Sequence, residues 1–83
     1  MKLRYFAWVR ERAGLAEEEV ALPADVATVG DVIAWLRTRG PEFDHAFAAA
    51  GTIRAAIDFS HVDHSAPVAG AREIAFFPPV TGG

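Results

Sequence analysis

Two stretches of the sequence carry residues that could do chemistry, and they differ in kind. The segment DFSHVDHS contains Asp58, His61, Asp63 and His64, whose carboxylates and imidazoles could bind a metal or transfer protons. The last eight residues, FFPPVTGG, contain no histidine, cysteine or acid, but they present a carboxylate after two glycines. The first stretch suggests a metal or hydrolytic site, and the second suggests a carboxylate on which another protein acts.

The spacing of the histidines argues against a metal site. In an extended segment a separation of three residues places His61 and His64 on opposite faces, and no third histidine is nearby in the sequence. The chain has no cysteine, so disulfides, thiolate catalysis and the common structural zinc sites are excluded. We therefore expect solvated histidines in a turn and no metal, which calorimetric titration with zinc would test.

The tail has the features of a part that enters another protein. Pro78 and Pro79 fix φ and favour a stiff, extended exit, while Gly82 and Gly83 have no Cβ and can pass through a narrow opening. The six residues 78–83 can span about 20 Å when extended. We predict a folded domain over residues 1–77 and an extended tail over 78–83.

Composition narrows the class of protein. A chain of 83 residues makes one domain with one small core, and a net charge of −3 provides no basic excess for binding nucleic acid. The first twelve residues, MKLRYFAWVRER, are interrupted by arginines and resemble neither a signal peptide nor a membrane span. We expect a cytoplasmic protein that binds neither nucleic acid nor membrane.

Periodicity and turn residues predict the elements that would position the tail. Thr28 and Asp31 are typical of a helix N-terminus, and Gly40 is expected to end that helix. Alternating residues indicate strands, and Pro and Gly indicate the connections. The expected elements are strands over 2–9 and 17–22, a helix over 29–39, a short helix over 42–50, a strand over 52–60, a turn-rich connection over 61–71 and a last strand over 72–77.

This order favours an α+β fold in which one main helix lies across one face of a mixed sheet. The first and last strands are then neighbours at the centre of the sheet. The topology is that of the β-grasp, or ubiquitin-like, fold.

Alternation in the outer residues predicts a surface for a partner. If Ile74 and Phe76 face the helix, Phe77 points away from the core, and the same logic turns Phe6 and Trp8 outward from the first strand. These three aromatic residues would form one apolar patch beside the departing tail. A contiguous patch on a small domain is typical of a partner site, although short covering segments are the alternative.

Three stretches, MKLRYFAWVRERAG, TVGDVIAWLRTRGP and EIAFFPPVTGG, resemble the small subunit of molybdopterin synthase in matching order along the chain. The resemblance implies a β-grasp sulfur carrier that is not an enzyme on its own and binds no permanent cofactor. An ubiquitin-activating-like enzyme would adenylate Gly83 with ATP, and a sulfur donor protein would supply the sulfur of a thiocarboxylate. Phe77 would lie at the partner surface, and the threading residues would be Pro78, Pro79, Val80, Thr81 and Gly82.

The same resemblance implies the substrate and the complex. The tail would enter the large subunit and donate sulfur to precursor Z, cyclic pyranopterin monophosphate, to form the dithiolene of molybdopterin. The expected complex has two small and two large subunits. This sequence departs from the family pattern at Asp58, where the family often has asparagine. It also departs in the turn before the last strand, which in the family is acidic around a glycine and here reads VAGARE, with Gly70.

Three other functions stay open at this point. A thiamine-pathway sulfur carrier shares the fold and the two final glycines, but it is typically shorter and lacks FFPPVTGG. An ubiquitin-like protein modifier uses the same adenylation. A pure binding module would not be activated at Gly83 by ATP.

Overall fold

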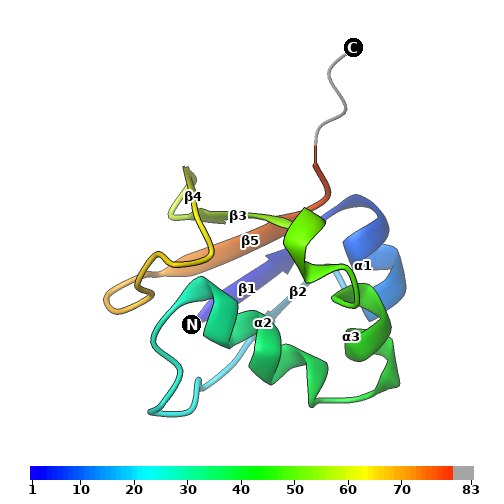
Figure 1. The fold of residues 1–83 in the computed structure, drawn as a ribbon, viewed down its shortest axis with the longest axis horizontal. Helices are drawn as coiled ribbons and strands as arrows, with labels where there is room; N and C mark the ends of the chain where they lie inside the picture. The colour runs from blue at the N-terminus through cyan, green and yellow to red at the C-terminus, as the bar shows by residue number, and fades with distance from the viewer. Residues whose placement is uncertain (80–83) are drawn as a thin grey trace.

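The computed structural model describes residues 1–79, which form one five-stranded sheet with helices packed on one face (Figure 1). The elements in chain order are β1 (Lys2–Tyr5), α1 (Ala7–Ala13), β2 (Glu17–Glu19), α2 (Val29–Arg37), α3 (Pro41–Ala46), the 3-10 turn η1 (Ala50–Thr52), β3 (Arg54–Ile57), β4 (Ser60–Val62) and β5 (Glu73–Phe77).

The sheet has the order β2-β1-β5-β3-β4 and is mixed. β1 and β5 are parallel and adjacent, while β2 pairs antiparallel with β1 and β3 pairs antiparallel with β5. The predicted α+β, β-grasp topology is therefore confirmed, including the central position of the first and last strands. The short strands β2 and β4 form the two edges.

The core lies between the sheet and the helices, and aromatic rings fill its centre. Phe76 is fully buried, with its ring centroid 5.3 Å from that of Phe47 and 6.2 Å from that of Tyr5. Ile74 is also fully buried, whereas Phe77 is only partly so. The predicted inward and outward faces of β5 are therefore confirmed.

The main helix begins as predicted. The Thr28 side chain accepts a hydrogen bond from the Asp31 N–H at 3.1 Å, and the Asp31 carboxylate accepts from the Thr28 N–H at 3.1 Å, which completes a capping box. The helix ends at Arg37 with Thr38 as its C-cap, two residues before the predicted end. The prediction for Gly40 is wrong, because Gly40 is the N-cap of α3.

The predicted strand over residues 2–9 is wrong beyond Tyr5. Ala7 has a φ of 52°, which turns the chain out of the sheet and into α1, and Gly14 ends this helix with a φ of 85°. Val9 and Ala13, four residues apart, are both buried on the core side of the helix. A helix thus occupies most of the connection between the first two strands, and Gly14 is its C-cap.

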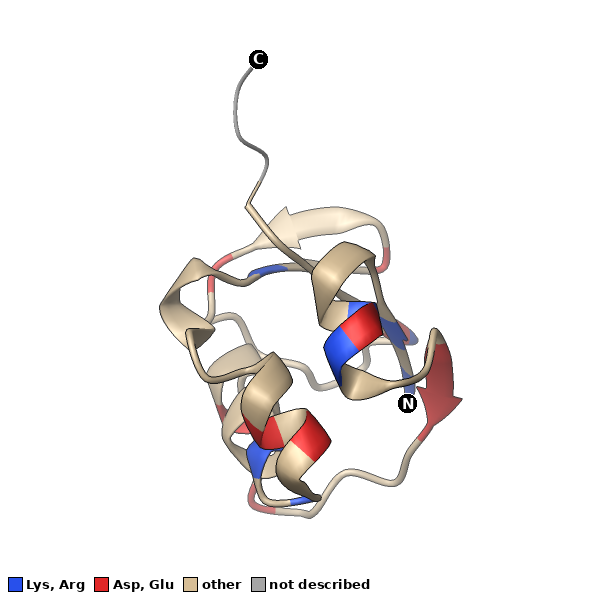
Figure 2. Cartoon of the chain, turned by 90° about the vertical axis from the view of Figure 1, so that its right-hand side faces the viewer, with Lys and Arg blue, Asp and Glu red and all other residues tan. Residues whose placement is uncertain are grey.

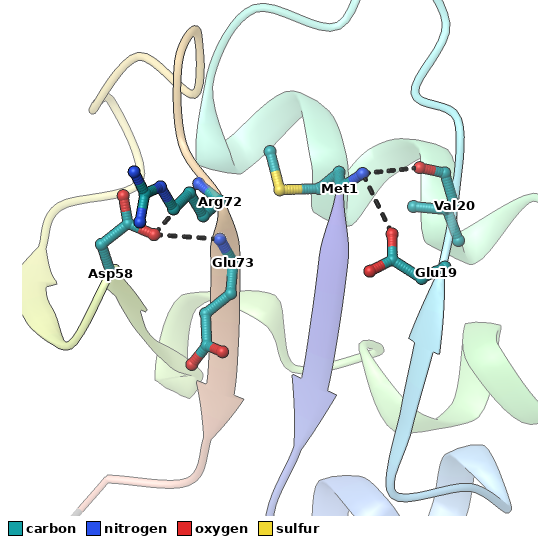
Figure 3. Close-up of polar contacts among 6 residues, drawn as sticks. All are labelled: Met1, Glu19, Val20, Asp58, Arg72 and Glu73. Carbon is teal, nitrogen blue, oxygen red and sulfur yellow. Dashed lines mark hydrogen bonds and ion pairs between the residues drawn. The ribbon is translucent and has the colours of Figure 1, made fainter.

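The expected connection over residues 61–71 also contains a strand. β4 pairs antiparallel with β3 through a turn in which Asp58 and Phe59 have φ values of 47° and 72°. The Asp58 carboxylate accepts hydrogen bonds from the backbone N–H groups of Arg72 and Glu73, both at 3.0 Å (Figure 3). Asp58 therefore ties the β3–β4 turn to the start of β5.

The chain leaves the sheet at the end of β5, on the side away from the β3–β4 turn (Figure 1). No helix in residues 1–79 is long and apolar enough to cross a membrane.

Candidate functional site

The surface around the end of β5 combines exposed aromatic and cationic side chains. We call Arg4, Phe6, Arg54, His61 and Phe77 the tail-base surface. Arg4 lies between the buried Leu3 and Tyr5, and Arg54 lies between the buried Ile53 and Ala55, so both side chains face away from the core. The surface therefore occupies the face of the sheet opposite the helices.

Backbone pairing brings these residues together. Phe77 stands opposite Arg54 in the β3–β5 register, and the Phe6 N–H donates to the Phe76 carbonyl at 3.0 Å. His61 lies on β4, which pairs with β3, and stands opposite Ala56 in that register. Its ring lies 5.1 Å from the Phe77 ring, centroid to centroid. The tail thus departs from the middle of this surface.

The tail-base surface is locally basic, although the whole chain carries a net charge of −3. The Arg4 guanidinium lies 5.3 Å from the centre of the Phe6 ring and 3.7 Å from the Glu73 carboxylate. Within residues 1–79, Arg54 forms no ion pair and is exposed. An exposed guanidinium beside aromatic rings is a common composition for the centre of a protein interface.

One residue of the predicted aromatic patch, Trp8, does not lie on the tail-base surface. Trp8 lies on α1, packs partly against the core and is covered by the Arg12 guanidinium, 4.4 Å from its ring. The expected patch of three aromatics on the open face of the sheet is therefore wrong for Trp8. Phe6 and Phe77 do lie on that face, and Phe6 is 40% exposed.

Sequence reasoning missed the roles of Arg54 and His61. A signal was available for Arg54, because alternation with Ile53 and Ala55 turns it outward. His61 had no comparable signal, since its contact with Phe77 depends on strand β4, which was expected to be a turn.

The tail is described only at its start. Pro78 and Pro79 are partly buried and follow directly on β5. Val80, Thr81, Gly82 and Gly83, to which threading and chemistry are assigned, lie outside the described residues.

The two candidate metal ligands lie in different surroundings. Nε2 of the His64 ring lies 2.7 Å from the Ile53 carbonyl oxygen, which is within hydrogen-bond distance. The His64 carbonyl accepts a hydrogen bond from the Gly30 N–H at 2.8 Å. The expectation of two solvated turn histidines is confirmed only in part. His61 is exposed but lies in β4 against Phe77, whereas His64 lies in a turn but is partly buried. Over residues 1–79, no group of three or more His, Cys, Asp or Glu side chains is arranged to hold a metal ion.

A second polar cluster, which we call the corner network, consists of Tyr5, Glu18 and Arg39. The Tyr5 hydroxyl donates to Glu18 at 2.8 Å, and Arg39 donates to both Glu18 oxygens at 2.7 and 2.8 Å. The hydrogen bond from Arg39 holds the pKa of Glu18 below its ordinary value, and burial raises the pKa of Tyr5. These groups satisfy one another and join β1, β2 and the segment after α2.

Comparison with known proteins points to one family. The ThiS family model matches residues 3–83. The molybdopterin synthase sulfur carrier subunit of Escherichia coli strain K12 is 36% identical over 83 residues, covering 100% of this chain and 99% of that protein.

Two solved structures share the fold over almost the whole chain. A Pyrococcus furiosus protein provisionally named molybdopterin converting factor, subunit 1, superimposes with a TM-score of 0.72 at 27% identity, covering 95% of each chain. Small archaeal modifier protein 1 of Haloferax volcanii gives a TM-score of 0.72 at 25% identity, covering 96% of this chain and 97% of that one. With the family match over 3–83 and the full-length relative, this chain belongs to the ThiS family.

Proposed function

We propose that this chain is the sulfur carrier subunit of a molybdopterin synthase and that it is not an enzyme on its own. The observation that carries the proposal is the exit of the tail from the central strand β5, beside an exposed surface of aromatic and cationic residues. A rigid base positions a tail, and an exposed aromatic surface beside it fits a partner that receives the tail. The full-length relative named as a sulfur carrier subunit supports the same assignment.

The proposed chemistry takes place at Gly83. A carboxylate oxygen attacks the α-phosphorus of ATP, pyrophosphate leaves, and the carboxylate becomes an acyl adenylate. A persulfide sulfur of a donor protein then attacks the acyl carbon, and AMP leaves with the C–O electron pair. A second thiol breaks the S–S bond of the resulting acyl disulfide, forms a disulfide with the donor's remaining sulfur and releases the thiocarboxylate. The thiocarboxylate supplies sulfur to precursor Z, cyclic pyranopterin monophosphate, for the dithiolene of molybdopterin. ATP is consumed by the activating enzyme and is not a resident cofactor of this chain.

The residues divide into those that react, those that thread and those that bind. In the proposal Gly83 reacts and Phe6 and Phe77 contact the large subunit, with Arg4, Arg54 and His61 around them. Trp8 is left out of this contact because it lies on α1. The threading residues are Pro78, Pro79, Val80, Thr81 and Gly82.

The proposed partners follow from these roles. They are the large subunit, in a complex of two small and two large chains, an ubiquitin-activating-like adenylyltransferase and a sulfur donor protein. The acidic net charge argues against nucleic acid as a partner. The proposed compartment is the cytoplasm. The chain has no cysteine, so it forms no disulfide that would require an oxidising compartment.

Deletion of Gly83 tests the proposal most directly. The reacting carbon would be withdrawn by about 3.3 Å, and a misplacement of 1 Å can cost on the order of 100-fold in rate. We expect molybdopterin formation from precursor Z, with large subunit, activating enzyme, ATP and sulfur donor present, to fall at least about 100-fold. One alanine added after Gly83 should be similarly harmful, because it displaces the carboxylate and adds a Cβ.

Two controls make this experiment specific. The melting temperature and the affinity for the large subunit should stay close to those of the unmodified chain in both variants. Equal molybdopterin formation by the deletion variant and the unmodified chain would refute the sulfur-carrier proposal.

A protein modifier is the second candidate, favoured by the similarity to small archaeal modifier protein 1. A thiamine-pathway carrier is a third, since it also belongs with ThiS proteins. Intact mass spectrometry of the chain purified from its native cells separates these from a pure binding module. A thiocarboxylate adds about 16 Da, which must be localised to Gly83 to exclude oxidation of Met1 or a tryptophan.

A further inference from the structure

The chain has very few primary amines that could react with an activated C-terminus. Lys2 is the one lysine among the 83 residues, and the other seven basic side chains counted with it are arginines. Arginine stays protonated in proteins and does not act as an amine nucleophile, whereas a neutral lysine amine does. The surface is therefore positively charged at many points but offers a single side-chain amine.

That amine lies among carboxylates. Lys2 Nζ is 2.9 Å from Glu17 Oε2, and in the sheet register Lys2 stands opposite Glu19 on β2 and Glu73 on β5. These glutamates alternate with inward-facing residues, so they share the open face of the sheet with Lys2. In Figure 2 the acidic strand β2 lies beside the basic start of the chain.

The Met1 amino group is held in a similar way. It donates to the Val20 carbonyl at 3.1 Å and lies 3.4 Å from Glu19 Oε2 (Figure 3). An attacking amine must release these contacts and its proton.

The topology also separates Lys2 from the tail of its own chain. Lys2 pairs with Glu73 at the start of β5, and the tail leaves after Phe77 at the other end. Glu73 and Phe77 are four residues apart, which corresponds to about 13 Å along β5. Pro78 and Pro79 follow β5 in a direction away from Lys2 (Figure 1), so attack within one chain requires the tail to turn back over the sheet.

We propose that Lys2 is the one side-chain amine at which this chain can be acylated, and that the scarcity of lysine and the carboxylates around Lys2 protect an activated C-terminus from conjugation between copies. The inference rests on the proposed function, which requires an acyl adenylate at Gly83. In the unwanted reaction a neutral amine attacks the acyl carbon, the C–O bond to AMP breaks, AMP leaves with the electron pair, and the amine proton passes to water. Each copy lost in this way could no longer receive sulfur.

The two forms of protection, the scarcity of lysine and the ion pair with Glu17, differ in the size of their effect on the acylation rate. The ion pair with Glu17 should slow acylation of the Lys2 amine by a factor of about two to five. This is about the largest effect on a rate that the interaction energy of an exposed ion pair can produce. The other seven basic side chains are arginines, which offer no amine for the competing reaction. Scarcity is therefore the larger effect and the Glu17 ion pair the smaller one.

The first test uses a chemical acylating reagent and does not depend on any enzyme. The chain is treated with limiting N-hydroxysuccinimide acetate, and acetylation at each amine is followed by peptide mass spectrometry. Glu17→Gln should speed acetylation of Lys2 about two- to five-fold, and the lysine introduced by Arg10→Lys, exposed on α1, should react faster than Lys2 by a similar factor. Glu42→Gln, an exposed change on α3, is the matched control and should leave the rate at Lys2 unchanged.

The second test uses the activated chain. With activating enzyme and ATP but no sulfur donor, the unmodified chain should release pyrophosphate and form few dimers, whereas Arg10→Lys should form more, linked from Gly83 to the new lysine. Lys2→Arg should form none through a side chain.

The outcomes separate this inference from the proposed function. Lack of pyrophosphate release would refute the proposed function, and acetylation would still report on the protection of Lys2. Pyrophosphate release with equally rapid dimer formation through Lys2 and through the lysine of Arg10→Lys would overturn the inference alone. Equal acetylation of Lys2 in the unmodified chain and in Glu17→Gln would overturn the role of the ion pair.

Discussion

The corner network and the tail-base surface both combine an arginine with aromatic rings, but they use them differently. In the corner network Arg39 donates two hydrogen bonds to Glu18, and its guanidinium also lies 4.7 Å from the Phe43 ring centre. At the tail-base surface Arg54 stands beside Phe77 and forms no ion pair with any residue in 1–79. Groups that satisfy one another within the fold stabilise it, whereas the exposed groups beside the tail are the ones that we propose to bind a partner.

The largest expected difference between the two regions lies within one strand. Phe76→Asp should unfold the domain, because loss of a buried Phe side chain costs about 3–5 kcal/mol and burial of a charge adds to that. Phe77→Asp should leave the fold largely intact but weaken binding to the large subunit by at least about 2 kcal/mol. Thermal melts and pull-downs measure the two effects, and the reverse assignment would contradict the inward and outward faces of β5.

The corner network should affect stability without affecting binding. Arg39→Met keeps much of the packing but removes both hydrogen bonds to Glu18, and we expect a loss of about 1–3 kcal/mol in the free energy of unfolding. Arg37→Met is the matched control, because the Arg37–Asp44 pair is more exposed and should cost no more than about 1 kcal/mol. Urea denaturation measures both, and weaker binding of Arg39→Met to the large subunit would undo the contrast between the regions.

The cationic part of the tail-base surface should affect binding without affecting stability. Arg54→Glu should weaken binding to the large subunit by about 1 kcal/mol, and the loss should shrink as salt is raised. The melting temperature should change little because Arg54 is exposed. Arg10→Glu, an exposed change on α1, is the control, and equal weakening by both would show that only the net charge matters.

The smallest expected effect is the pH dependence of the corner network. The hydrogen bond from Arg39 lowers the folded pKa of Glu18 below its ordinary value of 4.5, so its contribution to stability is present above that pH and falls as the pH drops through the folded pKa. Burial raises the folded pKa of Tyr5 above its ordinary value of 10.0, so the contribution of the neutral phenol is present below pH 10 and falls at higher pH.

Denaturation of the unmodified chain and of Glu18→Gln across pH measures this effect. The difference in their free energies of unfolding should be largest near neutral pH and should narrow below about pH 4.5. A difference that stays constant down to pH 2 would show that Glu18 is not stabilised as a carboxylate.

The turn between β3 and β4 is held by a side chain of its own. One oxygen of Asp58 accepts hydrogen bonds from the backbone N–H groups of Arg72 and Glu73. This position thus supplies a hydrogen-bond acceptor that joins the turn to β5.

The sequence by itself determined the features that depend on near neighbours. The N-terminus of α2 follows from Thr28 and Asp31, three residues apart, and the two faces of β5 follow from strict alternation. The predicted order of the main helix and the central strands was sufficient to identify the β-grasp topology. These signals act over a few residues, so a single stretch of sequence contains them.

Only the tertiary structure decided where strands end and which distant residues meet. Residues 7–9 continue the alternation of the first strand, while the four-residue spacing of Val9 and Ala13 fits a helix, and packing against the core selects the helix. Likewise, His61 meets Phe77 because β4 pairs with β3 and β3 with β5, across segments far apart in the chain. The corner network arises in the same way, since Glu18 and Arg39 lie 21 residues apart. Such contacts depend on strand register and helix packing, which are set by burial in the whole core and not by any local pattern.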